Sequence, residues 1–435
     1  MIVVYSPYTS PRLTYTLKTI FNRWLKVDVV VYTDSQTVIA HESPCKIWYA
    51  PEQGGVAIPW IFNSSFLEQS EGLKHKVKLR GEGEDVHIFP GEGMMSFDVF
   101  AAVFFCISRY EEYDHSNPDE HGRFQAKHSL AYRMGFLDVP IVDIWRNKLV
   151  KLLIDRWGVD PFTSPKASCL LTVDVDNASA YAFKGVTRSI LGIGRALLRM
   201  DKTLIYRLNT LFSSKKDPYL TYDSQWAIAR RHNVPLIHFV LCAGLSPHDR
   251  SLHPKNSDFH KLIENMETEA EVGWHPSYSA FGNLAELEKE HQRLCAIASN
   301  RIRISRQHYI RLQFPETYRQ LIALGITDDY SMGYPDRDGF RAGTSLSFNF
   351  FDAVANEETN LTVHPFYFLD TYFSERKKMS TDKVMPIMKR YADLVFKYGG
   401  EFNLVWHHRT FSELQPSWKG WTRALDNLLH YATSK

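Results

Sequence analysis

From residue 167 to residue 435, short apolar segments alternate with segments of helical periodicity, and this alternation restricts the folds that the chain can adopt. Apolar runs bounded by polar residues predict buried strands, and the intervening segments space their apolar residues as amphipathic helices do. Strands joined by helices pair in parallel through right-handed crossovers. We therefore expect a parallel α/β sheet, closed as a barrel rather than left open. The predicted strands are 168–173, 234–242, 271–274, 302–305, 325–327, 360–363 and 401–406.

Most of these predicted strands end at residues that can ionise or bind a metal. In β/α barrels the loops that follow the strands converge around the barrel axis, so residues at the C-terminal strand ends meet in one site. Any one of them could be a buried structural group, but together they predict an active site at that end. They are Asp174 and Asp176, His275, Arg306 and His308, Asp328 and Asp329, His364, and His407.

The segment TVDVDN ends the first of these strands with two carboxylates, Asp174 and Asp176. Alternate side chains of an extended segment point the same way, so both carboxylates lie on one side of the strand. A carboxylate from one strand and an imidazole from another, here His275, form the usual beginning of a divalent metal site, which needs a further protein ligand. Ser279, four residues after His275, and His308 are the two candidates for that position.

Five segments follow one another between residues 167 and 435: TVDVDN, EVGWHPSYS, SRQHYIR, DYSMGYPDRDGFRAGTS and LVWHHRTFS. In this order they resemble the motif series of NodB-type polysaccharide deacetylases, metal-dependent hydrolases that remove acetyl groups from N-acetylated sugars. The resemblance implies a distorted seven-stranded (β/α) barrel over residues 167–435. It also implies a divalent metal cofactor, with zinc as the expected ion, and a glycan or sugar precursor as substrate.

The resemblance further implies a role for each matching residue. Asp174 corresponds to the catalytic base, and Arg306 to the arginine that orients it. Asp176 and His275 correspond to metal ligands. His407 corresponds to the late histidine that acts as general acid. On this resemblance the chain would be a metal-dependent carbohydrate N-deacetylase.

Two positions depart from the family pattern. The family usually has a second histidine four residues after the first, where this chain has Ser279, and a serine hydroxyl is a poor ligand for zinc. His308 stands where the family more often has proline after its arginine. Its imidazole could replace the missing ligand, or it could have a structural or substrate-contacting role.

Four further residues are candidates for substrate binding. Arg341 lies in the Gly-rich, charged segment 333–345, and its guanidinium suits an anionic sugar substituent or a carboxylate of the site. The others, at or beside predicted strand ends, are Trp274, Tyr309 and His364.

Residues 1–160 also alternate short strands with helical segments, which predicts a smaller α/β domain before a linker at 161–165. The polar stretch YEEYDHSNPDEHGRF, residues 110–124, is interpreted as a solvated surface loop, because its spacing fits no known metal geometry. The sequence assigns no role to this domain. The expected strands are 2–5, 28–32, 56–62 and 86–89, and the expected helices are 12–25, 99–113 and 142–157.

Charge and cysteine content exclude several classes of protein. The 51 Lys and Arg residues nearly balance 49 Asp and Glu, so no basic field points to nucleic acid. Five widely spaced cysteines indicate neither a disulfide framework nor a Cys-x-x-Cys metal site. Without a leader-like N-terminus or a long apolar stretch, a cytoplasmic location is expected. No oligomeric state is indicated.

The segment 186–212 is the candidate for a peripheral membrane contact. It places Ile, Leu and Tyr at helical intervals with basic residues between them. Such a helix either lies on an anionic membrane surface or, more commonly, packs on its own domain. In the first case a lipid-linked glycan would be a natural substrate. The basic residues are Arg188, Arg195, Arg199, Lys202 and Arg207.

Two other functions remain open from the sequence. In a glycosyltransferase, Asp174 and Asp176 would hold Mg²⁺ or Mn²⁺ against a nucleotide sugar, but three histidines, His275, His308 and His407, would then have no role. A non-catalytic carbohydrate-binding protein would account for Ser279, but not for the retained acid and base candidates.

Overall fold

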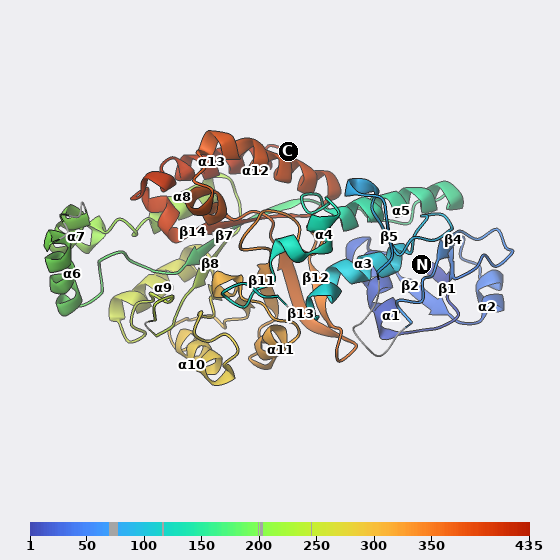
Figure 1. The fold of residues 1–435 in the computed structure, drawn as a ribbon, viewed down its shortest axis with the longest axis horizontal. Helices are drawn as coiled ribbons and strands as arrows, with labels where there is room; N and C mark the ends of the chain where they lie inside the picture. The colour runs from blue at the N-terminus through green and yellow to red at the C-terminus, as the bar shows by residue number, and fades with distance from the viewer. Residues whose placement is uncertain (69–76, 115–116, 199, 201–202, 245) are drawn as a thin grey trace.

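The computed structural model describes residues 1–68, 77–114, 117–198, 200, 203–244 and 246–435. The molecule is elongated (Figure 1). An N-terminal α/β unit forms one end, the larger sheet lies in the middle, and a pair of helices, α6 (Val186–Leu198) and α7 (Thr203–Phe212), projects at the opposite end. The chain thus has a mixed α/β fold.

The N-terminal unit is built on a parallel sheet in the order β2-β1-β3-β4. The first helix begins at residues that favour a helix N-terminus. The side chain of Ser10 accepts a hydrogen bond from the backbone N–H of Leu13, and Pro11 stands at the first helical position. The strands of this unit are β1 (Ile2–Tyr5), β2 (Val29–Tyr32), β3 (Lys46–Ala50), β4 (Trp60–Phe62), β5 (Leu79–Arg80) and β6 (His87–Ile88), and its helices are α1 (Pro11–Leu17), α2 (Ser35–Ala40), α3 (Val99–Ile107), α4 (Leu130–Arg133) and α5 (Ile141–Trp157).

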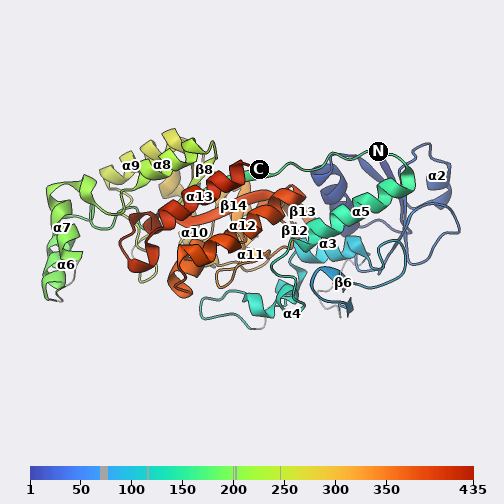
Figure 2. The same cartoon turned by 90° about the horizontal axis from the view of Figure 1, so that it is seen from above.

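The larger sheet has the order β12-β13-β11-β10-β9-β8-β7-β14, and every neighbouring pair is parallel except β12 with β13. Helices α12 (Thr381–Tyr398) and α13 (Trp421–Thr433) lie side by side over one face (Figure 2). The strands are β7 (Ser168–Val175), β8 (Leu236–Val240), β9 (Glu271–Trp274), β10 (Ile304–Ser305), β11 (Asp328–Met332), β12 (Phe348–Asp352), β13 (Glu357–Pro365) and β14 (Glu401–His407). The remaining helices are α8 (Tyr222–Arg231), α9 (Ser257–Glu269), α10 (Leu284–Cys295) and α11 (Glu316–Ala323).

Within residues 167–435, one predicted strand is wrong and one observed strand lies outside the predicted set; in the N-terminal unit, β3 and β5 were not predicted. The segment 325–327 forms no strand; β11 begins one residue later, so that Asp328 and Asp329 are its first residues rather than residues beyond its end. The antiparallel strand β12 lies outside the expected parallel set. The other predicted strands of residues 167–435 overlap observed ones.

The two ends of the parallel series approach each other after β13. Leu369, just beyond β13, forms an isolated parallel bridge with Val405 of β14. The side chain of Asn403 also donates to the carbonyl oxygen of Pro365, at 3.3 Å. A single isolated bridge does not amount to strand pairing between β13 and β14, so the closure of the seven-stranded barrel stays a prediction.

Alternation along β7 separates two environments. Leu171, Val173 and Val175 belong to the main hydrophobic core. Leu170 points to the other side and belongs to a small separate cluster of buried residues. Asp174 follows it by four residues, so its side chain points to the same side. This side therefore changes from apolar to polar toward the C-terminal end of the strand. The cluster comprises Leu170, Ile237, Phe239, Ile304 and Tyr330.

The two units share an extensive interface. The main hydrophobic cluster runs without a break through both of them. Asp143 of α5 accepts hydrogen bonds from the hydroxyls of Thr344 (2.6 Å) and Ser345 (3.0 Å). Arg341 forms a bidentate ion pair with Glu112, in which Nε lies 2.9 Å from Oε1, and both side chains are buried. Because separating the units would expose their shared apolar core to water and break these contacts, we expect them to move as one body.

Candidate metal centre

Three side chains from neighbouring strand ends converge on one point. Asp176 follows β7, His275 follows β9 and His308 follows β10. Asp176 Oδ1 lies 3.3 Å from His275 Nε2 and 3.5 Å from His308 Nε2. One ligand atom from each of the three lies within 4.8 Å of the others. A carboxylate and two imidazoles at this spacing are suited to a transition-metal ion with an open coordination position.

The hydrogen bonds around this point support the same interpretation. Asp176 Oδ1 and His275 Nε2 are buried and have no hydrogen-bond partner among the described residues. Buried polar atoms in native proteins rarely lack partners, so two such atoms facing each other indicate a group that binds both. The donor set fits a divalent ion, and zinc suits a mixed nitrogen and oxygen set.

The outer nitrogens of both imidazoles are engaged, which directs their Nε2 atoms inward. His275 Nδ1 lies 2.5 Å from the carbonyl oxygen of Arg306, and His308 Nδ1 lies 3.0 Å from Asp249 Oδ1. Partners of this kind orient metal-binding histidines. Burial lowers the pKa of His308, which favours the neutral imidazole that a metal requires.

Ser279 does not belong to the converging group. Its hydroxyl donates to Asp249 Oδ2 at 2.6 Å, and its backbone N–H donates to the same carboxylate. Asp249 in turn contacts His308, so Ser279 supports a ligand candidate indirectly. Asp249 itself was not identified from the sequence.

We predict that His308→Ala removes most of the bound metal, whereas Ser279→Ala retains it. The first change deletes an imidazole from the converging group; after the second, Asp249 still accepts hydrogen bonds from the Ser246 hydroxyl and from the Tyr278 N–H. Metal content of the purified variants, determined by plasma mass spectrometry, measures the difference. Equal losses would place Ser279 among the ligands.

Asp174, the predicted base, has a different environment from Asp176. Arg306 Nη1 donates to Asp174 Oδ1 at 2.9 Å and to the Thr172 hydroxyl at 2.8 Å, and Arg306 Nε donates to the carbonyl oxygen of Tyr330. Arg306 and Asp174 are both buried. The arginine is therefore held by two strands, β7 and β11, and fixes the carboxylate that it faces.

His407 lies at the same end of the sheet and has a buried carboxylate partner. Its Nδ1 is 2.7 Å from Asp370 Oδ1, and its backbone N–H donates to Asp370 Oδ2. Burial alone would lower the pKa of His407, but the charge and hydrogen bond of Asp370 outweigh burial and raise it above its ordinary value. His408 faces away, stacked on Tyr222, and burial lowers its pKa to about 3.

Arg409 is a second residue that the sequence interpretation missed. Its Nη1 pairs with Asp176 Oδ2, and its Nε lies 2.9 Å from Glu375 Oε1. The arginine thus occupies one carboxylate oxygen of Asp176 and leaves the other facing the two histidines.

The stretch 110–124 is only in part the solvated loop that the sequence suggested, because both of its ends are buried. Arg123 is buried and donates to the carbonyl oxygen of Tyr309 at 2.8 Å, and His121 contacts the Tyr278 hydroxyl. Tyr309 and Ile310 both have positive φ, 59° and 53°, a strained conformation for residues with a Cβ and most of all for a β-branched one. The N-terminal unit therefore braces the strained turn that follows His308.

The structure places three predicted substrate-binding residues away from this point. Trp274 precedes His275 on its strand, so it faces the opposite side and packs against His291 of α10. His364 pairs with Asp328 and Glu401, the first residues of β11 and β14, and so lies toward the N-terminal strand ends.

Arg341 is the third of these residues, and it is committed to the ion pair with Glu112 described above. Tyr309, in contrast, lines a cavity of about 340 Å³ together with Asp174, Asp176, His275 and other residues.

The cavity over the converging group is rich in arginine. Arg123, Arg250, Arg376 and Arg409 all line it, against three acidic residues. Arg250 and Arg376 are exposed and have no ion-pair partner within the part of the chain that the structure describes. The cavity can therefore accept an anionic ligand. The acidic residues are Asp174, Asp176 and Glu375.

Comparison with known proteins gives limited matches. Residues 2–158 match the model of a family of unknown function, DUF7033. No curated protein matches the chain.

Among solved structures, a protein described as a polysaccharide deacetylase from Mycobacterium smegmatis is similar at a TM-score of 0.41 and 14% identity, over 62% of this chain and 85% of that chain. A further one from Pseudomonas aeruginosa PAO1 and the Puue allantoinase each have a TM-score of 0.40 and 13% identity, with the same shares covered. At these TM-scores and identities, the likenesses establish no activity for this chain.

Proposed function

We propose that the protein is a metal-dependent hydrolase that removes an acetyl group from an N-acetylated sugar or glycan. The observation that carries this proposal is the convergence of Asp176, His275 and His308 beside two further groups of opposite function. One is Asp174, held by an arginine, and the other is His407, held by a carboxylate.

Asp176, His275 and His308 would hold the metal ion. When bound, a divalent cation supplies Lewis-acid polarisation of a carbonyl oxygen and acidifies a water molecule. The chain's own residues then have to move two protons, one away from the attacking water and one to the departing amine.

Asp174 is suited to accept the first proton. Arg306 fixes the position of this carboxylate, and only its Oδ1 is engaged among the described residues. Oδ2 is thus available as the acceptor. His407 is suited to donate the second proton, because Asp370 favours its protonated form and orients the ring through Nδ1, which leaves Nε2 to donate.

The lining of the cavity supports a sugar as substrate. Tyr219, Tyr309 and His248 contribute aromatic surfaces close to the polar groups of the site, a combination typical of small-molecule pockets. The order of sequence segments that resemble NodB-type deacetylases points to the same substrate class.

The side chains around the metal centre also bear on the two other functions, a glycosyltransferase and a non-catalytic carbohydrate-binding protein. Mg²⁺ or Mn²⁺ in a glycosyltransferase prefers oxygen ligands, whereas here two imidazoles face Asp176, and Asp174 pairs with Arg306. One observation favours a non-catalytic carbohydrate-binding protein: Arg409 already pairs with Asp176.

Metal content and acetate release test the proposal together. We expect full-length protein purified without chelator to contain zinc or a similar transition metal in stoichiometric amount and to release acetate from N-acetylated oligosaccharides. Removing the metal with a chelator should abolish release, and adding zinc back should restore it. Absence of both metal and acetate would favour the binding protein. Mg²⁺ or Mn²⁺ bound only with a nucleotide sugar would favour the transferase.

A further inference from the structure

The helices α6 and α7 form a hairpin that stands apart from both α/β units. They pack against each other, and Figures 1 and 2 place them at the end of the molecule opposite the N-terminal unit. Of the basic residues predicted in this segment, Arg199 and Lys202 lie outside the described residues, as does the side chain of Arg188. None of the helices in the described residues has the length and apolarity needed to span a membrane.

One face of α6 exposes apolar residues, of which Ile190 and Leu191 line the hollow described below. Ile190, Leu191, Leu197 and Leu198 are exposed, and Leu198 is 87% exposed. These positions, i, i+1, i+7 and i+8, share one face of a helix. Ala196, on another face, is buried. The large apolar side chains of this helix are thus exposed, whereas a helix that packs on its own domain buries them.

Helix α7 also exposes apolar residues. Ile205, Leu208 and Phe212 are exposed at positions i, i+3 and i+7, and Phe212 is 87% exposed. Leu211 is exposed as well. Contiguous exposed apolar residues of this extent mark a surface that binds a partner or a membrane rather than water.

The segment of sequence that contains the hairpin is strongly positive. Residues 177–216 contain eight basic residues and one acidic residue, although the whole chain has a net charge of only +2, so the rest of the chain is net negative. Arg195 is exposed on α6 beside the apolar face. Apolar residues flanked by Lys and Arg are the features of an interfacial helix, and each basic residue near an anionic membrane contributes about 1 kcal/mol. A second copy of this chain would bring the same positive charge and be repelled.

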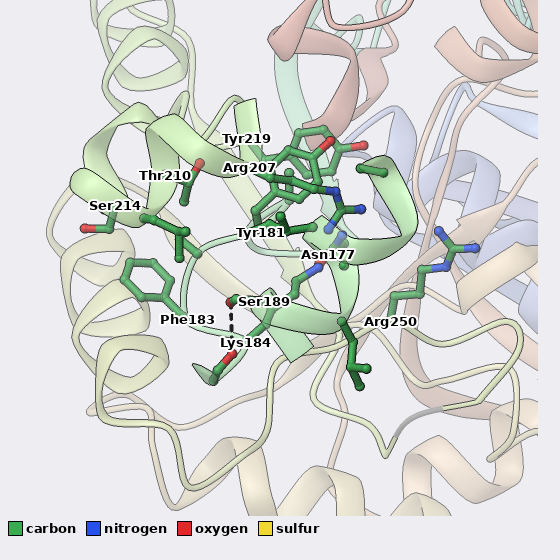
Figure 3. Close-up of a pocket in the computed structure, with 18 of the residues that line it drawn as sticks. Asn177, Tyr181, Phe183, Lys184, Ser189, Arg207, Thr210, Ser214, Tyr219 and Arg250 are labelled. Atoms are coloured by element: carbon green, nitrogen blue, oxygen red, sulfur yellow. Dashed lines mark hydrogen bonds between the residues drawn. The ribbon is translucent and has the colours of Figure 1, made fainter. Parts of the chain in front are cut away.

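A hollow connects the hairpin to the metal centre. It has a volume of about 1310 Å³ and lies between the hairpin and the segment that follows β7 (Figure 3). Arg207 of α7 lies over the Tyr181 ring, with its guanidinium carbon 4.5 Å from the ring centroid. Asn177, Tyr219 and Arg250 line both this hollow and the cavity over the metal centre.

We propose that the α6–α7 hairpin docks the protein on an anionic lipid bilayer. The apolar faces of both helices enter the interfacial region, and the surrounding basic residues contact lipid phosphates. This docking brings the hollow and its arginines to the membrane, where they can receive an N-acetylated sugar attached to a lipid through phosphate. The statement about the substrate rests on the proposed function; the docking does not.

Vesicle sedimentation of the full-length protein tests the docking. We expect binding to vesicles of phosphatidylcholine with phosphatidylglycerol, weakening as salt is added, and little binding to phosphatidylcholine alone. Replacing Leu198, Ile205 and Phe212 together by Ser should weaken binding at least tenfold. These side chains are exposed and lie outside the hollow, so folding and acetate release from soluble substrates should not change. The matched control replaces two exposed apolar residues elsewhere, Leu284→Ser with Val354→Ser.

Several results would overturn the docking proposal. They are absence of binding to anionic vesicles, equal binding to both vesicle types, and unchanged binding of the triple variant. A dimer that the triple variant abolishes, without vesicle binding by the unaltered protein, would assign the surface to self-association. Asp176→Asn separates the two proposals, because it should bind vesicles normally whether or not the site is a hydrolase.

Discussion

Asp174→Asn is expected to lower acetate release about 10²- to 10⁴-fold, the usual contribution of a general base, while leaving the bound metal in place. Asp176→Asn is expected to lose both metal and activity. The two carboxylates differ in their partners: Asp174 faces Arg306, whereas Asp176 faces His275 and His308. An amide at position 174 cannot accept the proton, but it leaves the group of metal-binding atoms intact.

The comparison requires metal content and initial rates for both variants at the same protein concentration. Asp328→Asn is the matched control, because Asp328 is an aspartate of the same sheet that pairs with His364, away from the metal centre. It should retain both metal and activity. If Asp174→Asn and Asp176→Asn behaved identically, the proposed division of labour would be wrong.

The strands that could be predicted from the sequence are those with apolar runs. β7 and β14 lie next to each other in the sheet and are buried over most of their length, so their sequences are apolar. The start of β11 was predicted wrongly because the strand begins with two aspartates, which the sequence pattern assigned to the loop after the strand. Asp328 contacts His364, and Asp329 accepts a hydrogen bond from the Ser305 hydroxyl. Periodicity cannot detect a buried carboxylate that a distant residue satisfies.

Some residues of the candidate site could be predicted from the sequence, and others could not. Asp176, His275 and His308 are recognisable because each follows a strand, and parallel strands bring their ends together. Asp249 and Asp370 act through long-range contacts with His308 and His407, 59 and 37 residues away along the chain, which no local pattern encodes. Asp370 follows β13 closely, and this strand-end position is the one signal that could have identified it.

The contribution of the N-terminal unit is also a long-range property. Composition correctly marks residues 110–124 as polar, but polarity does not distinguish a solvated loop from a buried ionic network. Glu112 and Arg341 are 229 residues apart, and their pairing removes the arginine from the substrate-binding candidates. An arginine in a Gly-rich segment could equally have faced a ligand.

His407→Ala is expected to lower turnover of an N-acetylated sugar far more than turnover of an activated aryl ester. An amine must be protonated to leave, whereas a phenolate of low pKa leaves without a proton. The structure favours His407 for this role because Asp370 raises its pKa and so maintains the acid form to higher pH. Its neighbour His408 stacks on Tyr222 with its pKa lowered to about 3, so it is neutral at working pH.

The measurement compares kcat/KM of His407→Ala with that of the unaltered protein on both substrates, at equal metal content. A loss of about 10²- to 10⁴-fold on the amide with a small loss on the ester is the signature of a missing general acid. Asp370→Asn provides an independent check, because it keeps the imidazole but removes the charge that raises its pKa. In that variant the amide activity should decline at lower pH than in the unaltered protein, since His407 would lose its proton earlier as pH rises. Equal losses of His407→Ala on amide and ester would instead assign His407 to binding or structure, because a missing proton donor cannot slow a reaction whose leaving group needs no proton.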